Sequence, residues 1–246
     1  MALRPEDRFD PVAAEYDRAR PGYPQHVIAW LCERAGVGPG DSALDLGAGT
    51  GLLSRRLVEA GLDVLAAEPN GRMRGVLAER VPAARVLPDP AEELSLGSGE
   101  VALATAAQAF HWFEQPRALE EIRRVLRPTG SFAVIWATIG DHSLAERINR
   151  VSFDLLEAQG GSAGPVPGEA LGWDEHFEPI GRRTFDSGWE LPPGMLPAHV
   201  GSYSVVANLP ELEREELLAE VADWPETTGG ATIPFEVEVN LARARD

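Results

Sequence analysis

The chain has a single cysteine and no long hydrophobic run, and each shortage excludes a class of protein. Because Cys32 is alone, an internal disulfide and a cysteine-built metal site are both excluded. We expect this cysteine to be a buried or half-buried helix residue. No apolar run approaches the roughly 20 residues that a membrane helix requires. Residues 1–10 are too charged for a secretory signal, so we expect a cytoplasmic protein.

The chain also lacks lysine: all 22 basic residues are arginine, and the net charge is −17. A chain this negative repels nucleic-acid phosphates and anionic lipid surfaces unless its basic residues form a concentrated stripe. Arg123, Arg124 and Arg127 come nearest to such a stripe, but their spacing suits one solvated helix face. We therefore expect neither a nucleic-acid partner nor a membrane partner.

What the chain does contain is a short strand followed by a glycine turn and a helix. Residues 43–46 form an apolar run broken only by Asp45, which is the pattern of a buried parallel strand. Residues 47–51 then form a turn without any bulky side chain, and residues 52–60 return to helical spacing. Glycines in such a turn let a ligand approach the backbone. Glu68 ends the next apolar run about 20 residues further on, where an acidic side chain can bind both ribose hydroxyls.

The sequence resembles the class I S-adenosylmethionine (SAM) dependent methyltransferases, because several motifs of that family occur here in its order. The turn Gly47-Ala48-Gly49-Thr50-Gly51 is similar to the first family motif. Five more segments match over roughly the first 140 residues. They are FDPVAAEYDRARPGYP, AAEPNGRM, PAEEL, AAQAFHWF and IRRVLRPTGSFAVIW. The small-molecule enzymes similar to the ubiquinone-biosynthesis and trans-aconitate types (methyltransferase type 11) are the nearest in pattern.

Alternating strand and helix patterns predict an α/β fold with a parallel sheet and right-handed crossovers, and 246 residues suffice for one such domain. The expected strands are 42–46, 63–67, 84–87, 101–107, 131–137, 182–191 and 232–240. The expected helices are 25–36, 51–60, 71–80, 116–126, 144–159, 196–206 and 211–224. A leader at 4–24 should begin as helix, and the Gly/Pro-rich residues 160–168 predict a loop.

The resemblance implies a Rossmann-like sheet of seven strands in the order 3-2-1-4-5-7-6. The last strand is expected to be antiparallel, with helices on both faces of the sheet. It also implies one methyltransferase domain over residues 1–246, made of four parts. These are a leader or lid at 1–24, a SAM-binding core at 25–140, a substrate-side insertion at 141–180 and a C-terminal part at 181–246. The insertion is expected to form a cap over the substrate side.

The resemblance also implies how the chain binds SAM. The turn Gly47, Ala48, Gly49, Thr50 and Gly51 would admit the methionine end, with amide groups at the next helix N-terminus near its carboxylate. Asp45 would receive the amino group; the alternative is that it only caps the glycine turn. Glu68 would accept the ribose hydroxyls.

The adenine and the sulfonium each have candidate partners. Pro69 and Met73 would hold the adenine ring between them, and Ala91 and Glu92 would meet its edge. Met73 taken alone is more typical of a core residue. Pro90 departs from the family pattern and removes a backbone donor there. Gln108 closes the fourth strand at the carboxyl edge of the sheet, where it would lie under the sulfonium.

His111 is the candidate general base. It lies three residues beyond Gln108 and beside Phe110, Trp112 and Phe113, in a setting that keeps a histidine neutral. We expect Phe110 and Trp112 to line the substrate site. The alternative is that His111 begins a helix, bonds to backbone and only shapes the pocket. Four histidines remain and show no metal-ligand spacing, so no metal site is expected. They are His26, His142, His176 and His199.

The leader contains Tyr16, Asp17, Arg20 and Tyr23, which are unusually aromatic and charged for a passive tail. Tyr16 and Arg20 share a helix face at i and i+4. The resemblance implies a lid in which Tyr16 and Arg20 reach the cofactor while Asp17 and Tyr23 face the substrate. Tyr16 would serve as an alternative catalytic group. In the other interpretation the leader is an amphipathic helix that packs on the sheet.

Two other functions remain open at this point. In the first, the protein binds SAM but does not transfer its methyl group. In the second, it is an enzyme of the same architecture that uses NAD or a nucleotide sugar. The acceptor is expected to be a small molecule, and methylation of oxygen, nitrogen, carbon or sulfur is left open. Both a monomer and a homodimer are left open as well.

Overall fold

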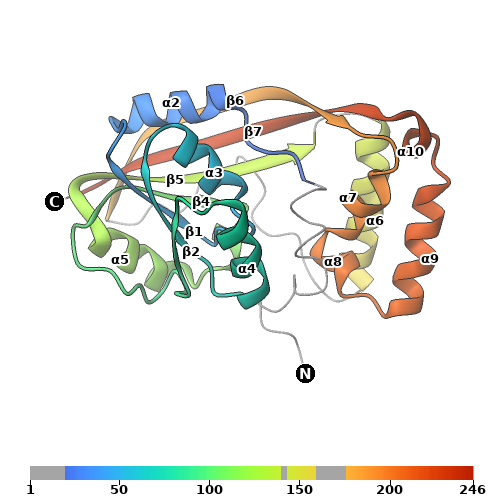
Figure 1. Ribbon diagram of the computed structural model, residues 1–246, viewed down its shortest axis with the longest axis horizontal. Coiled ribbons are helices and arrows are strands. Elements are labelled where there is room, and N and C mark those ends of the chain that lie inside the picture. The colour runs from blue at the N-terminus through green and yellow to red at the C-terminus, as the bar shows by residue number, and fades with distance from the viewer. Residues whose placement is uncertain (1–19, 140–142, 159–175, 246) are drawn as a thin grey trace. The chain divides into compact units, whose positions relative to one another are not determined.

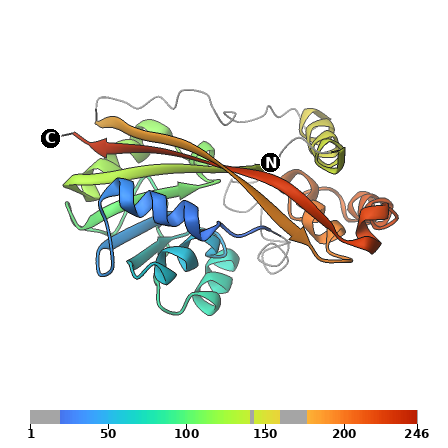
Figure 2. The same cartoon turned by 90° about the horizontal axis from the view of Figure 1, so that it is seen from above.

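A computed structural model describes residues 20–139, 143–158 and 176–245. Its seven strands form one sheet in the order β3-β2-β1-β4-β5-β7-β6, which confirms the expected order (Figure 1). They are β1 Ser42–Leu46, β2 Asp63–Ala67, β3 Arg85–Leu87, β4 Val101–Ala107, β5 Leu126–Ile139, β6 Phe177–Leu191 and β7 Ala231–Ala244. β1 to β5 pair in parallel where their registers are given, and β7 runs in the opposite direction (Figure 2).

The helices alternate with the first five strands and then gather in the C-terminal part of the chain. They are α2 Gln25–Ala35, α3 Leu52–Glu59, α4 Gly71–Arg80, the 3₁₀ helix η3 Phe110–Trp112, α5 Gln115–Val125, α6 Ser143–Ala158, α7 Leu196–Gly201, α8 Ser204–Ala207, α9 Glu211–Ala222 and α10 Pro225–Gly229. Figure 2 shows α2, α3 and α4 on one face of the first strands and α5 on the other. None of the helices described is long and apolar enough to cross a membrane.

The described residues form two compact units, each built from separate stretches of sequence. The sheet unit takes in residues 22–137, 176–185 and 237–245, and the helical unit takes in 20–21, 138–139, 143–158 and 186–236. The boundary between them falls within β5, β6 and β7. The expected cap at 141–180 is described only over 143–158, which is α6, and over 176–180, where β6 begins.

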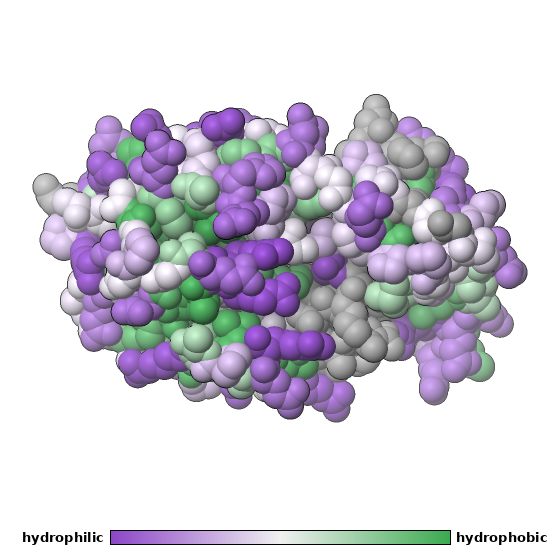
Figure 3. All heavy atoms as spheres, turned by 45° about the horizontal axis from the view of Figure 1, so that its top comes forward, coloured by the Kyte–Doolittle hydropathy of each residue, from purple (hydrophilic) through white to green (hydrophobic). Residues whose placement is uncertain are grey.

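The core of the sheet unit lies on both faces of its central strands. Leu44 and Leu46 of β1 and Phe132 and Val134 of β5 are fully buried. Because helices cover both faces, these strands read as continuous apolar runs instead of alternating ones. On α5 the buried residues recur at helical spacing, with Ala118, Leu119, Ile122 and Val125 facing the sheet. Outside this core, hydrophilic side chains are interspersed over the visible face (Figure 3).

β5 begins five residues earlier than the sequence pattern indicates. Val101 pairs with Leu126 and Leu103 with Ser131, so residues 127–130 are an irregular insertion in the ladder. A Cβ on Gly130 would lie 3.0 Å from the Arg127 carbonyl oxygen, which explains glycine at this point. A periodicity of apolar residues cannot reveal such a polar insertion in a strand.

The helical unit also differs from expectation in three places. The single helix expected at 196–206 is divided into α7 and α8, because Tyr203 takes an extended conformation. The short α10 was not expected, and β6 begins at Phe177 instead of residue 182. The core of this unit includes Leu144, Ile148 and Trp224.

Candidate functional site

The glycine turn between β1 and α3 leaves an open space beside Gly49. Gly47, Gly49 and Gly51 all have positive φ, at 63°, 58° and 89°. A Cβ on Gly47 would lie 2.6 Å from the Ala109 Cβ, and one on Gly51 would lie 2.5 Å from the Leu77 Cδ1. A Cβ on Gly49 would meet no atom within 4 Å. The outer glycines therefore permit close packing, and the middle one faces room for a ligand.

The turn also holds a buried hydroxyl without a partner. Thr50 is 1% exposed, and its Oγ1 makes no hydrogen bond to any residue that the structure describes. Buried polar atoms are nearly always satisfied, so this oxygen calls for a partner from outside the described chain. The open space at Gly49 and the unpaired hydroxyl of Thr50 both fit a bound polar ligand.

Glu68 follows β2 directly and joins this strand end to the glycine turn. Its Oε2 accepts a hydrogen bond from the Gly49 amide at 2.8 Å, and its Oε1 accepts one from the Asn70 amide at 2.8 Å. Burial raises the pKa of this carboxyl, and the two amide bonds partly oppose the rise. A carboxylate offers about four acceptor positions, so Glu68 keeps capacity for two hydroxyl donors.

Asp45 is fully buried within β1. It accepts hydrogen bonds from the Ser54 Oγ at 2.6 Å and from the Thr105 Oγ1 at 3.1 Å. Burial raises the pKa of Asp45 to about 6, and the nearby Glu68 carboxylate adds to the rise. Asp45 thus connects β1 to the first turn of α3 and to β4. Its expected contact with a ligand amino group stays a prediction.

The residues expected around the adenine lie at the ends of β2 and β3. Pro69 is exposed, whereas Met73 is buried and its amide is capped by the Asn70 Oδ1 at 2.8 Å. Ala91 is also buried. The Glu92 Oε1 accepts a hydrogen bond from the Glu114 amide at 2.7 Å, so this carboxylate already contacts the residue preceding α5. The adenine contacts stay predictions.

Gln108 follows β4 with a backbone conformation that the sequence does not reveal. Its φ is +55°, the single positive φ outside glycine in the residues described. Its amide donates to the Ile135 carbonyl at 2.9 Å, and its Nε2 donates to the Ala137 carbonyl at 2.5 Å. The backbone amide and the side-chain amide of Gln108 therefore both bind the end of β5.

His111 lies in η3 with its ring between two indoles. Its ring centroid is 4.6 Å from that of Trp112 and 5.3 Å from that of Trp136. Burial lowers the pKa of His111 to about 4, so the imidazole is neutral at pH 7, in accord with the sequence argument. The Nδ1 is buried and has no hydrogen-bond partner in the described chain. Sequence reasoning missed Trp136, whose position at the end of the fifth apolar strand was the available signal.

The residues expected to line the substrate site differ in their burial. Phe110 is 3% exposed and packs edge-on against Phe113 at 5.8 Å, so its ring belongs to the core. Trp112 is half-buried, and Tyr23 is buried in the sheet unit. The substrate contacts of these three residues stay predictions.

The leader is described only from Arg20, so Tyr16, Asp17 and the lid lie outside the described residues. Arg20 belongs to the helical unit. Its Nε donates to the Ser202 Oγ at 2.8 Å, and its guanidinium lies 4.1 Å from the ring centroid of Tyr203. The expected contact of Arg20 with the cofactor stays a prediction.

Within the described ranges, no group of three histidine, cysteine, aspartate or glutamate side chains is placed to hold a metal ion. Cys32 is half-buried, as expected, and burial raises its pKa.

Comparisons with known proteins agree on one family. A model of the methyltransferase domain matches residues 44–134. An uncharacterized methyltransferase of Mycobacterium tuberculosis is 36% identical over 213 residues, which cover 87% of this chain and 83% of that protein.

Two solved structures share the fold. A candidate type II methyltransferase of Anaeromyxobacter dehalogenans aligns with a TM-score of 0.67 and 26% identity, covering 92% of this chain and 97% of that one. A phosphoethanolamine N-methyltransferase of Haemonchus contortus, solved with phosphomonomethylethanolamine and S-adenosylhomocysteine, aligns with a TM-score of 0.57 and 15% identity. That alignment covers 98% of this chain and 60% of the other.

Proposed function

This chain belongs to the SAM-dependent methyltransferases, and we propose that it transfers the methyl group of SAM to a small-molecule acceptor, with His111 as the proton acceptor. The observation that carries this proposal is the neutral, half-buried imidazole of His111. It follows β4 at the edge of the sheet where β1 and β2 end in the glycine turn and Glu68. Open α/β sheets bind their ligands at this carboxyl edge.

The cofactor residues follow from the geometry of the turn. When bound, SAM supplies an electrophilic methyl group on a sulfonium. The open side of Gly49 gives room for its methionine part, and Thr50 offers an unpaired hydroxyl. Asp45 attracts its ammonium group and Glu68 accepts its ribose hydroxyls. Two raised carboxyl pKa values support this assignment, because a cationic ligand compensates buried negative charge.

The adenine and sulfonium contacts complete the proposed SAM site. Pro69 and Met73 border the adenine ring, Ala91 and Glu92 meet its edge, and Gln108 lies near the sulfonium. Pro69 offers an exposed ring surface, and Met73 is held in place by the cap that Asn70 makes on α4.

His111 supplies the group that takes up a proton. The attacking atom of the acceptor becomes more positive as it bonds to the methyl carbon, so any proton it carries becomes more acidic. A neutral imidazole has a nitrogen lone pair for that proton, and with a pKa of about 4 it is a weak base that suits an acceptor atom made strongly acidic by methylation, such as a hydroxyl oxygen. The alternative is that His111 orients the acceptor by a hydrogen bond and moves no proton.

A direct assay tests the proposed reaction. Purified protein is incubated with methyl-labelled SAM and a panel of small carboxylic acids, phenols, amines and thiols. We expect labelled product and S-adenosylhomocysteine in equal amounts with at least one acceptor class. Tight SAM binding without S-adenosylhomocysteine formation on any acceptor would support the alternative, a SAM-binding protein without transfer.

A matched pair of glycine variants tests the location of the cofactor. Gly49 and Gly99 both have positive φ, and at neither would a Cβ meet an atom within 4 Å. Alanine at either position should therefore cost a similar stability, about 1–2 kcal/mol. Only Gly49→Ala should weaken SAM binding, measured by calorimetry. Equal SAM affinity of the two variants would place the cofactor elsewhere.

A further inference from the structure

Gln108 holds a strained backbone conformation that only its surroundings maintain. A non-glycine residue at φ +55° costs free energy, and such residues persist where neighbouring groups fix them. Here the backbone amide binds the Ile135 carbonyl and the side-chain amide binds the Ala137 carbonyl. Two hydrogen bonds to β5 thus hold one residue in a left-handed turn.

This turn determines where the following segment lies. Directly after it, Ala109 packs so closely on the glycine turn that a Cβ on Gly47 would overlap its own Cβ. The Trp112 amide then bonds to the Ala109 carbonyl at 2.9 Å, which closes η3. The segment from Gln108 to Trp112 is therefore fixed against the cofactor turn on one side.

The same segment is fixed against β5 on the other side. The ring of His111 packs on Trp136, with centroids 5.3 Å apart. Trp136 stands between Ile135 and Ala137, the two residues whose carbonyls Gln108 binds. Gln108 and His111 thus contact consecutive residues of β5, Gln108 the carbonyls of Ile135 and Ala137 and His111 the ring of Trp136 between them. A shift of Gln108 relative to β5 would therefore displace His111 from Trp136.

We propose that Gln108 is a positioning residue for His111: its carboxamide bond to Ala137 anchors the left-handed turn to β5 and so keeps the imidazole against Trp136. This inference rests on the proposed function, in which His111 meets the acceptor. It adds to Gln108 a role toward the acceptor side of the reaction, separate from its expected place near the sulfonium. The length of glutamine matters, because the carboxamide must reach across to the next strand.

Replacing Gln108 by asparagine separates the contribution of the left-handed backbone from that of the carboxamide bond to Ala137. Gln108→Asn keeps an amide and suits a left-handed backbone better, but its shorter side chain does not reach the Ala137 carbonyl. The fold should melt close to the wild type, because the backbone preference of asparagine offsets the lost hydrogen bond. We expect kcat to fall by about 10- to 100-fold from the misplaced imidazole, while the dissociation constant of SAM changes by less than about threefold. Gln25→Asn, at the exposed start of α2, is the matched control and should change neither.

A second readout does not depend on activity. The imidazole pKa of His111, followed by NMR, should rise from about 4 toward its ordinary value of 6.5 in Gln108→Asn, because the ring leaves its buried position. An unchanged imidazole pKa would overturn the proposal, whatever the acceptor proves to be. Loss of SAM binding as large as the loss of kcat would also overturn it, and would assign Gln108 to the cofactor alone. A different result would contradict the proposed function and leave this inference standing. In that result His111→Gln keeps full activity, while the imidazole pKa of His111 still rises in Gln108→Asn.

Discussion

At the end of β1 and β2, two buried carboxylates, Asp45 and Glu68, each accept two hydrogen bonds. After the end of β4, the half-buried imidazole of His111 has one nitrogen without a partner in the described chain. Both regions belong to the sheet unit and both lie at the carboxyl edge of its parallel strands. The carboxylate region is pre-organised by the protein itself. In the imidazole region, by contrast, the ring of His111 is positioned by packing against Trp112 and Trp136 and by the left-handed turn at Gln108.

Burial shifts the pKa values of the two regions in opposite directions. It raises the pKa of Asp45 and Glu68 and lowers that of His111, because in each case the charged form loses hydration. A cation is the ligand that reverses this penalty at the carboxylates. A neutral proton donor is the ligand that can form a hydrogen bond with the imidazole. This difference is the basis on which we propose that the cofactor binds at the carboxylates and the acceptor at the imidazole.

The largest expected effect is that of a substitution at His111, which should change catalysis without changing cofactor binding. His111→Gln should lower kcat by about 10²–10⁴-fold, because an amide forms hydrogen bonds but does not accept a proton. SAM affinity should stay unchanged, since the imidazole acts on the acceptor. In the wild type the acid limb of kcat should follow the imidazole pKa of about 4. Steady-state kinetics and calorimetry measure both quantities.

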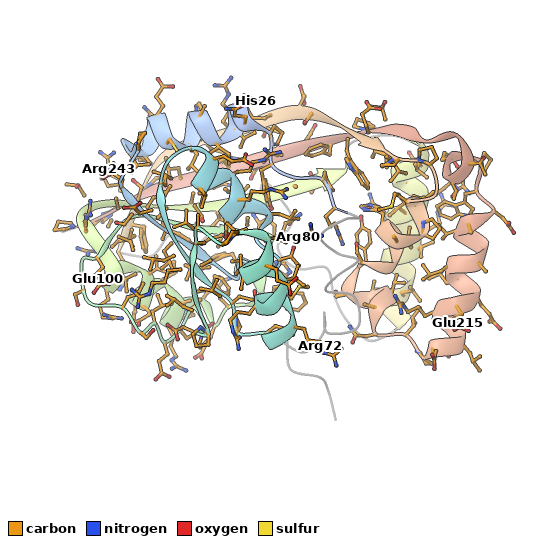
Figure 4. All side chains as sticks on the ribbon, in the orientation of Figure 1. His26, Arg72, Arg80, Glu100, Glu215 and Arg243 are labelled. Carbon is orange, nitrogen blue, oxygen red and sulfur yellow. The ribbon has the colours of Figure 1, made fainter. Side chains whose placement is uncertain are left out.

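His26→Gln is the control for this variant, because His26 lies exposed on α2 (Figure 4). It should behave as the wild type. If His111→Gln retains most of the activity, the imidazole only orients the acceptor, and the nucleophile is deprotonated beforehand or served by Tyr16.

The second effect concerns the carboxylate region. Glu68→Ala should weaken SAM binding by about 2–4 kcal/mol, or about 30- to 1000-fold, through loss of a buried charge-assisted pair of hydrogen bonds. It also removes the acceptor of the Gly49 amide, so the turn loosens. Calorimetry with Glu79→Ala, an exposed glutamate of α4, as control measures the change. An affinity within about threefold of the wild type would mean that the ribose binds elsewhere.

The smallest effect is a pH dependence that should be specific to the cofactor. Because the ammonium group of SAM favours the ionised form of Asp45, binding should weaken as pH falls below about 6, by up to about tenfold per pH unit. In Asp45→Asn the affinity should be lower at neutral pH and nearly independent of pH between 5 and 7. A wild-type affinity that is constant over this range would remove Asp45 from the cofactor site.

Without cofactor, the two regions should respond to acid in opposite ways. The pKa of Asp45 is raised in the folded state, from 3.8 to about 6, so its contribution to stability grows as pH falls through this window. The pKa of His111 is lowered, from 6.5 to about 4, so its contribution is lost as pH falls through nearly the same window. The two contributions therefore partly cancel, which leaves ligand binding as the clearer measure of each region.

The sequence predicted the carboxylate region far better than the imidazole region. β1, β2 and β4 have the expected bounds, because each is a mostly apolar run. The glycine turn and Glu68 follow from those bounds. The order of strands and turns along the chain was sufficient to predict this region, since its interacting groups lie at the ends of neighbouring strands.

The imidazole region depends on contacts that no local pattern contains. The left-handed Gln108 has no glycine signal, and Trp136 appears in the sequence only as one more strand residue. The same limit explains the division between α7 and α8. There the Ser202 Oγ donates to the His199 carbonyl, a side-chain bond that competes with helix continuation.

The contact between Gly47 and Ala109 has a consequence for how this enzyme can diversify. Gly47 is already as large as its position allows, because a Cβ there would lie 2.6 Å from the Ala109 Cβ. Neither position can gain bulk unless the chain that carries the imidazole moves. Changes that enlarge the acceptor site should therefore be better tolerated farther from this contact.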